Sequence, residues 1–170
     1  MPRPNRARPG SRTVRTPDAE PPASPQGSLL LDDQLCFALY AASRAVTARY
    51  RPLLDELGLT YPQYLVLLVL WERDSISVRD LGAALQLESS TLSPLLKRLE
   101  AGGLLRRERR ADDERSVAIR LTGAGAALRD RAAAVPLAIG DAMGLTPEQD
   151  ATAKHLLRLL TANVSGHERP

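Results

Sequence analysis

Hydrophobic positions along most of this chain recur every three or four residues, which is the period of an amphipathic helix. The first such pattern, over residues 29–57, predicts a long helix that ends at Gly58. Pro52 falls late in this pattern, so we expect a kink or a short break near Tyr50. A second helix is predicted over residues 62–73, and because it is apolar nearly all round it should be buried.

The middle of the chain predicts two short helices with a tight connection. A short strand or turn from Ser75 leads into a helix over about 78–85. The next helix follows Glu88, begins with small hydroxylic residues and ends at Gly102 and Gly103. Two such helices in succession form the helix-turn-helix arrangement.

The period then changes to that of β-strands. Residues 104–110 and 116–121 predict two strands, and the charged segment 111–115 connects them. A hairpin that follows a helix-turn-helix is a wing. The rest of the chain is helical again: residues 122–135 are Ala-rich, Pro136 and Gly140 are expected to interrupt or kink the pattern, and a last helix is predicted over 146–163.

Composition separates an N-terminal tail from the remainder of the chain. Residues 1–27 hold seven of the thirteen prolines and five arginines, which predicts a disordered basic tail. Outside this tail the 23 basic and 20 acidic residues reduce to 18 of each, so an argument for nucleic-acid binding must rest on local clusters. Aromatic residues make up only 4% of the chain, which favours a helical core of Leu, Val and Ala.

A single cysteine, Cys36, excludes an intramolecular disulfide framework and a Cys-rich metal site. The longest strongly apolar run, residues 64–71, is much shorter than the ~20 residues that cross a bilayer. The N-terminus has no apolar stretch of the kind found in a secretory signal. We therefore expect no membrane partner and a cytoplasmic location.

Two clusters have the side chains that DNA recognition requires. Short hydrogen-bonding groups open the second helix of the pair, with basic residues further along: Ser89, Ser90, Thr91, Ser93, Lys97 and Arg98. An ordinary helix-capping run uses the same hydroxylic residues, so this alternative stays open. The wing carries basic residues and a charged tip, at Arg106, Arg107, Arg109, Arg110, Asp112, Asp113, Glu114 and Arg115. An arginine at such a tip can enter a minor groove while neighbouring carboxylates orient it, and a solvated charged loop is the alternative.

Specific runs of residues carry a family resemblance from Leu31 to about Leu121. These runs are Leu-Asp-Asp-Gln-Leu-Cys-Phe-Ala-Leu-Tyr-Ala-Ala-Ser-Arg over 31–44, Leu-Thr-Tyr-Pro-Gln-Tyr over 59–64 and Asp-Asp-Glu-Arg-Ser over 112–116. The chain resembles the MarR family of dimeric winged-helix regulators, and in particular its OhrR branch, which senses organic hydroperoxides. In that branch three tyrosines surround a cysteine across the subunit boundary, and the matching positions here are Tyr40, Tyr50 and Tyr61.

The spacing around Cys36 can be examined independently of the resemblance. Tyr40 lies one helical turn after Cys36, so the two share a face. Tyr50 is about 21 Å further along a straight helix and cannot touch Cys36 of its own chain. If two copies cross near their first helices, Tyr50 and Tyr61 of one copy could approach Cys36 of the other.

A peroxide-reactive cysteine must be largely thiolate, which requires hydrogen-bond donors or positive charge. The pattern puts Cys36 too deep in its helix to gain from the helix dipole, while Asp32 and Asp33 oppose its ionisation. Tyrosine hydroxyls must then supply the donors. The alternative is a small cysteine that only fills a helix interface.

The predicted fold class is therefore mainly α: a winged helix-turn-helix with a small β-hairpin wing and a helical dimerisation region from both chain ends. The predicted divisions are a disordered basic tail over 1–27, a dimerisation and sensor helix over 28–61, a DNA-binding lobe over 62–121 and dimerisation helices over 122–165.

The predicted function is a repressor that leaves its operator when organic hydroperoxide oxidises Cys36. Its expected partners are pseudo-palindromic double-stranded DNA, a second copy of the chain and a low-molecular-weight thiol. Because no second cysteine exists, the expected endpoints of oxidation are a mixed disulfide with that thiol, a sulfenamide or overoxidation. No catalytic triad, metal site or cofactor motif is found, so we expect neither an enzyme nor a cofactor. The alternatives are a MarR-type repressor controlled by a phenolic or drug-like ligand, and a thiol peroxidase.

Overall fold

The computed structural model describes residues 27–73, 75–109 and 117–166. The chain divides into two compact units, residues 1–39 and residues 40–170. The tail over residues 1–26 lies outside the described residues, so its predicted disorder stays a prediction.

The first unit contains a 3₁₀ turn, η1 (Leu31–Asp33), and the start of α1 (Leu35–Asp55). The predicted start of the long helix near residue 29 is therefore wrong. Ser28 Oγ donates to Asp33 Oδ2 at 2.5 Å, and the Gln34 side chain donates to the Ser28 carbonyl at 2.6 Å. Such local side-chain bonds compete with the helical pattern, and Gln34 itself is extended at φ −87° and ψ 111°.

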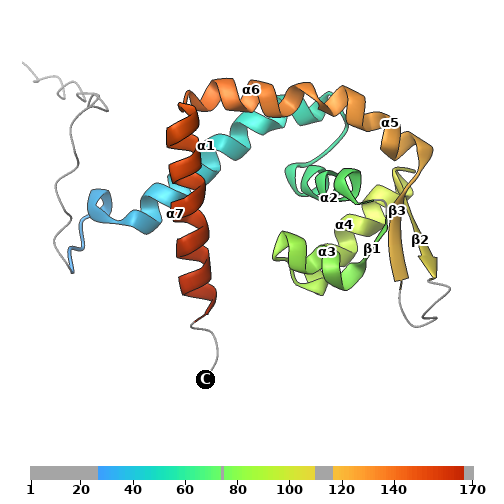
Figure 1. Cartoon of the computed structure of the whole chain (residues 1–170), viewed down its shortest axis with the longest axis horizontal. Coiled ribbons are helices and arrows are strands. Elements are labelled where there is room, and N and C mark those ends of the chain that lie inside the picture. The colour runs from blue at the N-terminus through green and yellow to red at the C-terminus, as the bar shows by residue number, and fades with distance from the viewer. Residues whose placement is uncertain (1–26, 74, 110–116, 167–170) are drawn as a thin grey trace, which may run out of the picture. The chain divides into compact units, whose positions relative to one another are not determined.

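In the second unit α1 (Figure 1) continues without a break to Asp55. Pro52 lies inside this helix. The predicted short break near Tyr50 is thus absent, and its alternative, a kink, stays a prediction. Pro52 removes one backbone hydrogen bond to the carbonyl of Ala48, and Ala48 is exposed, so water can hydrate that carbonyl. Gly58 follows with φ +68°, a conformation that favours glycine, which confirms it as the end of this segment.

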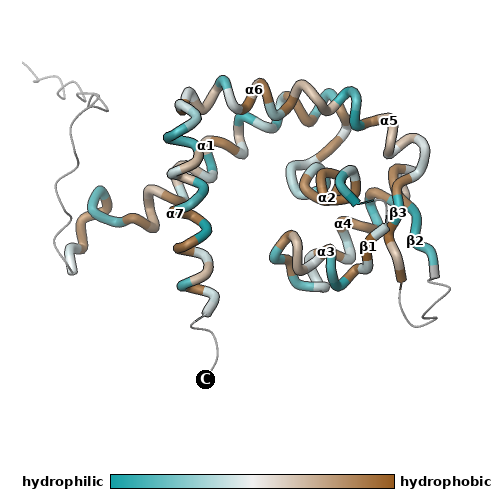
Figure 2. The backbone as a smooth tube through the Cα atoms, viewed as in Figure 1, coloured by the Kyte–Doolittle hydropathy of each residue, from teal (hydrophilic) through white to brown (hydrophobic). Residues whose placement is uncertain are grey.

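Helix α2 (Tyr61–Glu72) is buried, as its composition predicted. The Thr60 N–H donates to Gln63 Oε1 at 2.8 Å at its start, as in a capping box. Four of its residues are buried, Tyr64, Val66, Leu67 and Leu70, and the middle of the helix is coloured as hydrophobic in Figure 2.

The helix-turn-helix is confirmed as α3 (Val78–Leu85) and α4 (Ser89–Ala101). The connection is tight because Gln86 adopts a left-handed conformation at φ 54°. Gly82 on α3 is buried, and a Cβ there would lie 2.9 Å from the Leu87 carbonyl oxygen. Only a glycine at this position allows the backbone of the turn to approach α3 so closely.

The wing is confirmed as an antiparallel hairpin of β2 (Leu105–Arg109) and β3 (Val117–Leu121). A third strand, β1 (Ser75–Ser77), pairs with the other side of β3, so the sheet order is β1-β3-β2. The segment predicted as a strand or a turn is therefore a strand. The tip of the wing, residues 110–116, lies outside the described residues.

Three helices complete the chain: α5 (Gly123–Ala132), α6 (Ala134–Met143) and α7 (Pro147–Ser165). The predicted interruption occurs earlier than expected, at Ala133. Pro136 is the third residue of α6, where its missing N–H has no helical partner, so it suits the start of a helix rather than breaking one. Gly140 lies inside α6.

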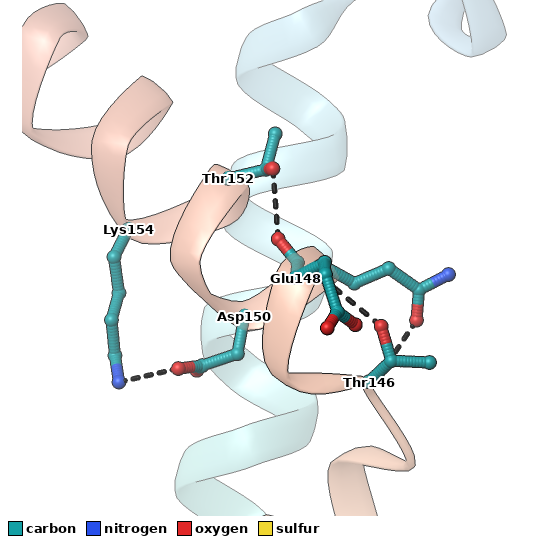
Figure 3. A network of polar contacts seen from close by, with 6 residues as sticks. Thr146, Glu148, Asp150, Thr152 and Lys154 are labelled. Atoms are coloured by element: carbon teal, nitrogen blue, oxygen red, sulfur yellow. Dashed lines mark hydrogen bonds and ion pairs between the residues drawn. The ribbon is translucent and has the colours of Figure 1, made fainter.

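The predicted last helix is confirmed as α7, and its start is fixed by a capping box. The Thr146 N–H donates to Gln149 Oε1 at 2.9 Å, and the Gln149 N–H donates back to Thr146 Oγ1 at 3.3 Å (Figure 3). One turn later Lys154 pairs with Asp150 at 2.7 Å. These local contacts are the described stabilising features of α7, since none of its residues is buried in the core.

The hydrophobic core lies among α2, α3, α4 and the sheet, and buried residues of α1, α5 and α6 extend it. Its fully covered side chains include Leu67, Leu81, Leu92 and Ile119, each 0% exposed. No helix within the described ranges is long and apolar enough to cross a membrane.

Candidate DNA interface and sensor site

The outer face of α4 carries the hydroxyl groups that the sequence singled out. Ser89, Ser90, Thr91 and Ser93 are all exposed. The N-cap residue is Glu88, which makes no side-chain cap bond, so the hydroxyls do not occupy the capping position. In the described part of the chain no other residue hydrogen-bonds to these hydroxyls, and they are therefore available to an external partner.

The opposite face of α4 is locked into the core by Leu92, Leu96 and Leu99. This orientation also directs the basic side chains of Lys97 and Arg98 to solvent. A helix held in this way presents one polar face as a rigid surface.

The wing is tied to α4 by an ion pair. Arg107 Nε on β2 lies 3.2 Å from Glu100 Oε2 on α4, and both side chains are partly exposed. Glu108 pairs with Arg106 at 2.6 Å and with Arg120 at 3.6 Å. Asp113 and Arg115, the predicted contacts at the wing tip, lie outside the described residues.

Cys36 is exposed and is the second residue of α1. The expectation that it lies too deep in its helix to feel the dipole is wrong, because the helix begins at Leu35 rather than near residue 29. The N-terminal turn of a helix favours negative charge.

Tyr40, four residues further along α1, is 56% exposed. Its hydroxyl accepts a hydrogen bond from Arg44 Nη1 at 2.7 Å. The guanidinium carbon of Arg44 also lies 5.5 Å from the centroid of the Tyr40 ring.

Tyr50 and Tyr61 lie together in the second unit. Their ring centroids are 4.6 Å apart, and neither hydroxyl hydrogen-bonds to any residue that the structure describes. Burial, and then the neighbouring Tyr61, raises the pKa of Tyr50, so this phenol keeps its proton and remains a donor. Tyr61 borders a cleft of about 490 Å³ between α1 and the start of α2.

Two aromatic residues that the sequence argument did not select extend this cluster. The ring of Tyr64 lies 5.9 Å from Tyr50 and 6.2 Å from Trp71. Burial, followed by Tyr50 and Tyr61, raises the pKa of Tyr64. Trp71 Nε1 donates to the carbonyl of Gly125 on α5 at 2.9 Å. Tyr61 and Tyr64 are three residues apart in one helix, and this spacing could have indicated that Tyr64 belongs to the cluster.

A helix-turn-helix with a free polar face and an antiparallel wing defines a winged-helix DNA-binding protein. The chain is 49% identical to the organic hydroperoxide resistance transcriptional regulator of Bacillus subtilis over 126 residues, which cover 74% of this chain and 84% of that protein. It therefore belongs to the MarR family of winged-helix regulators, in its OhrR branch, and is a transcription regulator rather than an enzyme.

Solved structures agree with this assignment. AbfR of Staphylococcus epidermidis is 36% identical with a TM-score of 0.65, over 79% of this chain and 94% of AbfR. AbfR has been solved bound to DNA in reduced and overoxidised forms, and also in a disulfide form. A cysteine-to-serine mutant of MarR from E. coli, complexed with operator DNA, shares the fold at 24% identity and a TM-score of 0.69, over 74% of this chain and 92% of MarR. Residues 48–131 match the family described as transcriptional regulator SarA/Rot.

Proposed function

We propose that this protein is a homodimeric repressor that leaves its operator when organic hydroperoxide oxidises Cys36. The observation that carries this proposal is the pair of phenols at Tyr50 and Tyr61, whose rings are 4.6 Å apart and whose hydroxyls lack partners in the described residues. Two such donors close together, one of them at the edge of a cleft, suit a thiolate brought by a second copy. The hydroperoxide signal is supported by the name of the B. subtilis relative.

A dimer is supported by the distribution of exposed apolar side chains. Apart from Leu68 and Val117, every large hydrophobic residue that is exposed in the described chain lies in 28–61 or 122–165, the two predicted dimerisation segments. Examples are Leu35 at 62% and Leu156 at 56% exposure. Exposed apolar surface of this extent is typical of a protein interface.

Within the dimer, Tyr40 of the same chain and Tyr50 and Tyr61 of the other chain would donate hydrogen bonds to the Cys36 thiolate. The start of α1 adds a favourable dipole, which helps to offset Asp32 and Asp33. Hydrogen bonds to a charged sulfur favour the thiolate, which is the reactive form.

The oxidation step transfers one oxygen atom. The Cys36 thiolate attacks the terminal oxygen of the hydroperoxide, an S–O bond forms as the O–O bond breaks, and the leaving alkoxide takes a proton to become an alcohol. Sulfur loses two electrons and becomes a sulfenic acid. Since the chain has no second cysteine, a low-molecular-weight thiol in the cytoplasm condenses with the sulfenic acid to a mixed disulfide and releases water.

Release from DNA would follow from the loss of the phenol-to-thiolate bonds and from the added bulk on sulfur. The rings of Tyr50, Tyr64 and Trp71 form a packed series, and Trp71 bonds the carbonyl of Gly125 at the start of α5. A shift at the phenols would therefore be passed to the helix that follows the wing.

In the reduced state the two lobes would bind half-sites about one helical turn apart, which matches a pseudo-palindromic operator. The hydroxyls of α4 would contact base edges, while Lys97, Arg98 and Arg107 would contact phosphates. Asp113 and Arg115 would act at the wing tip.

The test compares the full chain with Cys36→Ser in operator gel shifts, with and without cumene hydroperoxide. We expect both proteins to bind operator and only the wild type to be released by peroxide. Release of Cys36→Ser by peroxide would refute the sensor assignment. Steady-state peroxide consumption in the presence of a reducing thiol would instead identify a thiol peroxidase.

A further inference from the structure

The pairing of Tyr40 with Arg44 is a feature that the proposed mechanism does not yet use. Arg44 Nη1 donates to the phenol oxygen at 2.7 Å, and the guanidinium lies over the ring at 5.5 Å from its centroid. No carboxylate in the described ranges forms an ion pair with Arg44. Among the residues that the structure describes, the only polar partner of Arg44 is therefore the Tyr40 hydroxyl.

This contact determines what the Tyr40 hydroxyl can do. Because the phenol oxygen accepts from Arg44, its own proton points away from the guanidinium and is free for another acceptor. A hydrogen bond from an ionised donor is about twice as strong as a neutral one. Polarisation along a chain of hydrogen bonds then strengthens the next bond, in which the phenol is the donor.

We propose that Arg44 is a positioning residue of the sensor, which orients the Tyr40 hydroxyl and strengthens its hydrogen bond to the Cys36 thiolate. This inference rests on the proposed function, in which Tyr40 serves Cys36 one helical turn away. Arg44 does not take part in the redox step. It acts through Tyr40 by raising the population of the thiolate that attacks the hydroperoxide.

A guanidinium is suited to this role. It stays charged at all physiological pH values, and its planar group can donate to the phenol oxygen while covering the ring. Lysine keeps the charge and can donate to the phenol oxygen, but its ammonium group lacks the planar contact with the ring. We therefore expect Arg44→Lys to retain part of the effect that Arg44→Ala loses.

The experiment uses the full-length protein with Arg44→Ala, Arg44→Lys, Tyr40→Phe and the double variant Arg44→Ala/Tyr40→Phe. Arg49→Ala is the matched control, because Arg49 is an exposed arginine on the same helix without a tyrosine hydroxyl partner in the described residues. The first readout is the second-order rate constant for oxidation of Cys36 by cumene hydroperoxide. The second is the pH profile of its alkylation by iodoacetamide.

We expect Arg44→Ala to slow oxidation by roughly 1.5-fold to fourfold, because the Tyr40 bond to the thiolate is not lost but weakened by about 10–30%. Its alkylation profile should move to higher pH, Arg44→Lys should recover part of the rate, and Arg49→Ala should match the wild type. In the Tyr40→Phe background, removal of Arg44 should have no further effect. Thermal unfolding and operator affinity of the reduced proteins verify that each variant is folded.

Two results would overturn the inference. Arg44→Ala could react at the wild-type rate with an unchanged pH profile, or it could slow oxidation equally in the Tyr40→Phe background, in which case Arg44 does not act through Tyr40. If Cys36→Ser remains insensitive to peroxide in the same experiments, only the role of Arg44 fails. If Cys36→Ser is released by peroxide, the proposed function itself fails.

Discussion

Glu100→Gln should strengthen operator binding, although it removes an ion pair from the protein. In the free chain Glu100 of α4 holds Arg107 of the wing at 3.2 Å, close to the face that carries the unpaired hydroxyls. Removing the carboxylate releases Arg107 for a DNA phosphate. It also removes a negative charge from the surface that meets the DNA.

The structure sets the size of both effects. The side chains of Arg107 and Glu100 are 36% and 40% exposed, so solvent screens the pair. The free energy of unfolding should fall by less than about 1 kcal/mol. In the wild type the contact of Arg107 with a phosphate competes with its ion pair to Glu100, so the variant should form that contact more fully and steepen the slope of log K against log salt concentration by up to about 0.9. At roughly 0.15 M salt this corresponds to a gain in affinity of up to about fivefold.

The assay is fluorescence anisotropy of labelled operator with the reduced protein, over salt concentrations of about 50 to 200 mM. Asp150→Asn is the matched control, because it frees Lys154 from a 2.7 Å pair on α7, a helix to which the proposed function assigns no DNA contact. We expect a steeper slope for Glu100→Gln and no change for the control. An unchanged slope or a weaker affinity for Glu100→Gln would show that Arg107 does not reach a phosphate.

Three further changes test the fold around these sites. Leu96→Ala empties a position that is 1% exposed and should lower the free energy of unfolding by about 2 to 5 kcal/mol in urea denaturation. Gly125→Ala would place a Cβ against the backbone carbonyl of Leu104, which precedes β2, and should lower the free energy of unfolding by about 1 to 3 kcal/mol. Gly123→Ala is the control, because a Cβ there meets nothing within 4 Å and should leave the stability almost unchanged. Equal effects of the two substitutions would contradict the packing around Gly125. The backbone amide of Glu148, and then the Thr146 hydroxyl, hold the pKa of the Glu148 carboxyl below its ordinary value of 4.5. The ionised Glu148 carboxyl should thus stabilise the start of α7 above pH 4.5, and this stabilisation should be lost as the pH falls through the lowered pKa. The measurement is an NMR titration. If Glu148→Gln keeps the same pH dependence, the Glu148 carboxyl is not its cause.

Most of the fold could be predicted from the sequence because its signals are local. The leucines of α4 recur with the helical period, and Gly102 and Gly103 end the helix, so the helix-turn-helix can be identified from the sequence alone. The alternation of side chains in 104–121 likewise predicted the wing. These features need no knowledge of distant contacts.

The errors occurred where local hydrogen bonds or position within a helix decide the outcome. Ser28 and Gln34 bind nearby backbone and side-chain groups and produce a 3₁₀ turn, which hydrophobic periodicity cannot distinguish from the start of an α-helix. The predicted interruption at Pro136 is wrong because this residue lies in the first turn of α6, where proline is tolerated.

The sequence predicted which residues form the sensor site, but not how they contact one another. The sequence selected Cys36 and three tyrosines, but it did not indicate that Tyr50 contacts Tyr61 directly, because that contact joins two helices. The bond from Arg44 to Tyr40 was also missed, although four-residue spacing on a helix could have suggested it. The ion pair between Arg107 and Glu100 depends on the placement of the wing against α4, which no local pattern specifies.

The most direct test of the proposed switch measures the oxidation state of Cys36 and operator occupancy in the same sample. Reduced protein bound to labelled operator is titrated with cumene hydroperoxide, and each step is analysed by anisotropy and by intact-mass spectrometry after trapping of the sulfenic acid. We predict that the fraction of released operator rises in step with the fraction of oxidised Cys36. Complete oxidation with the operator still bound, or release while the thiol is intact, would contradict this mechanism.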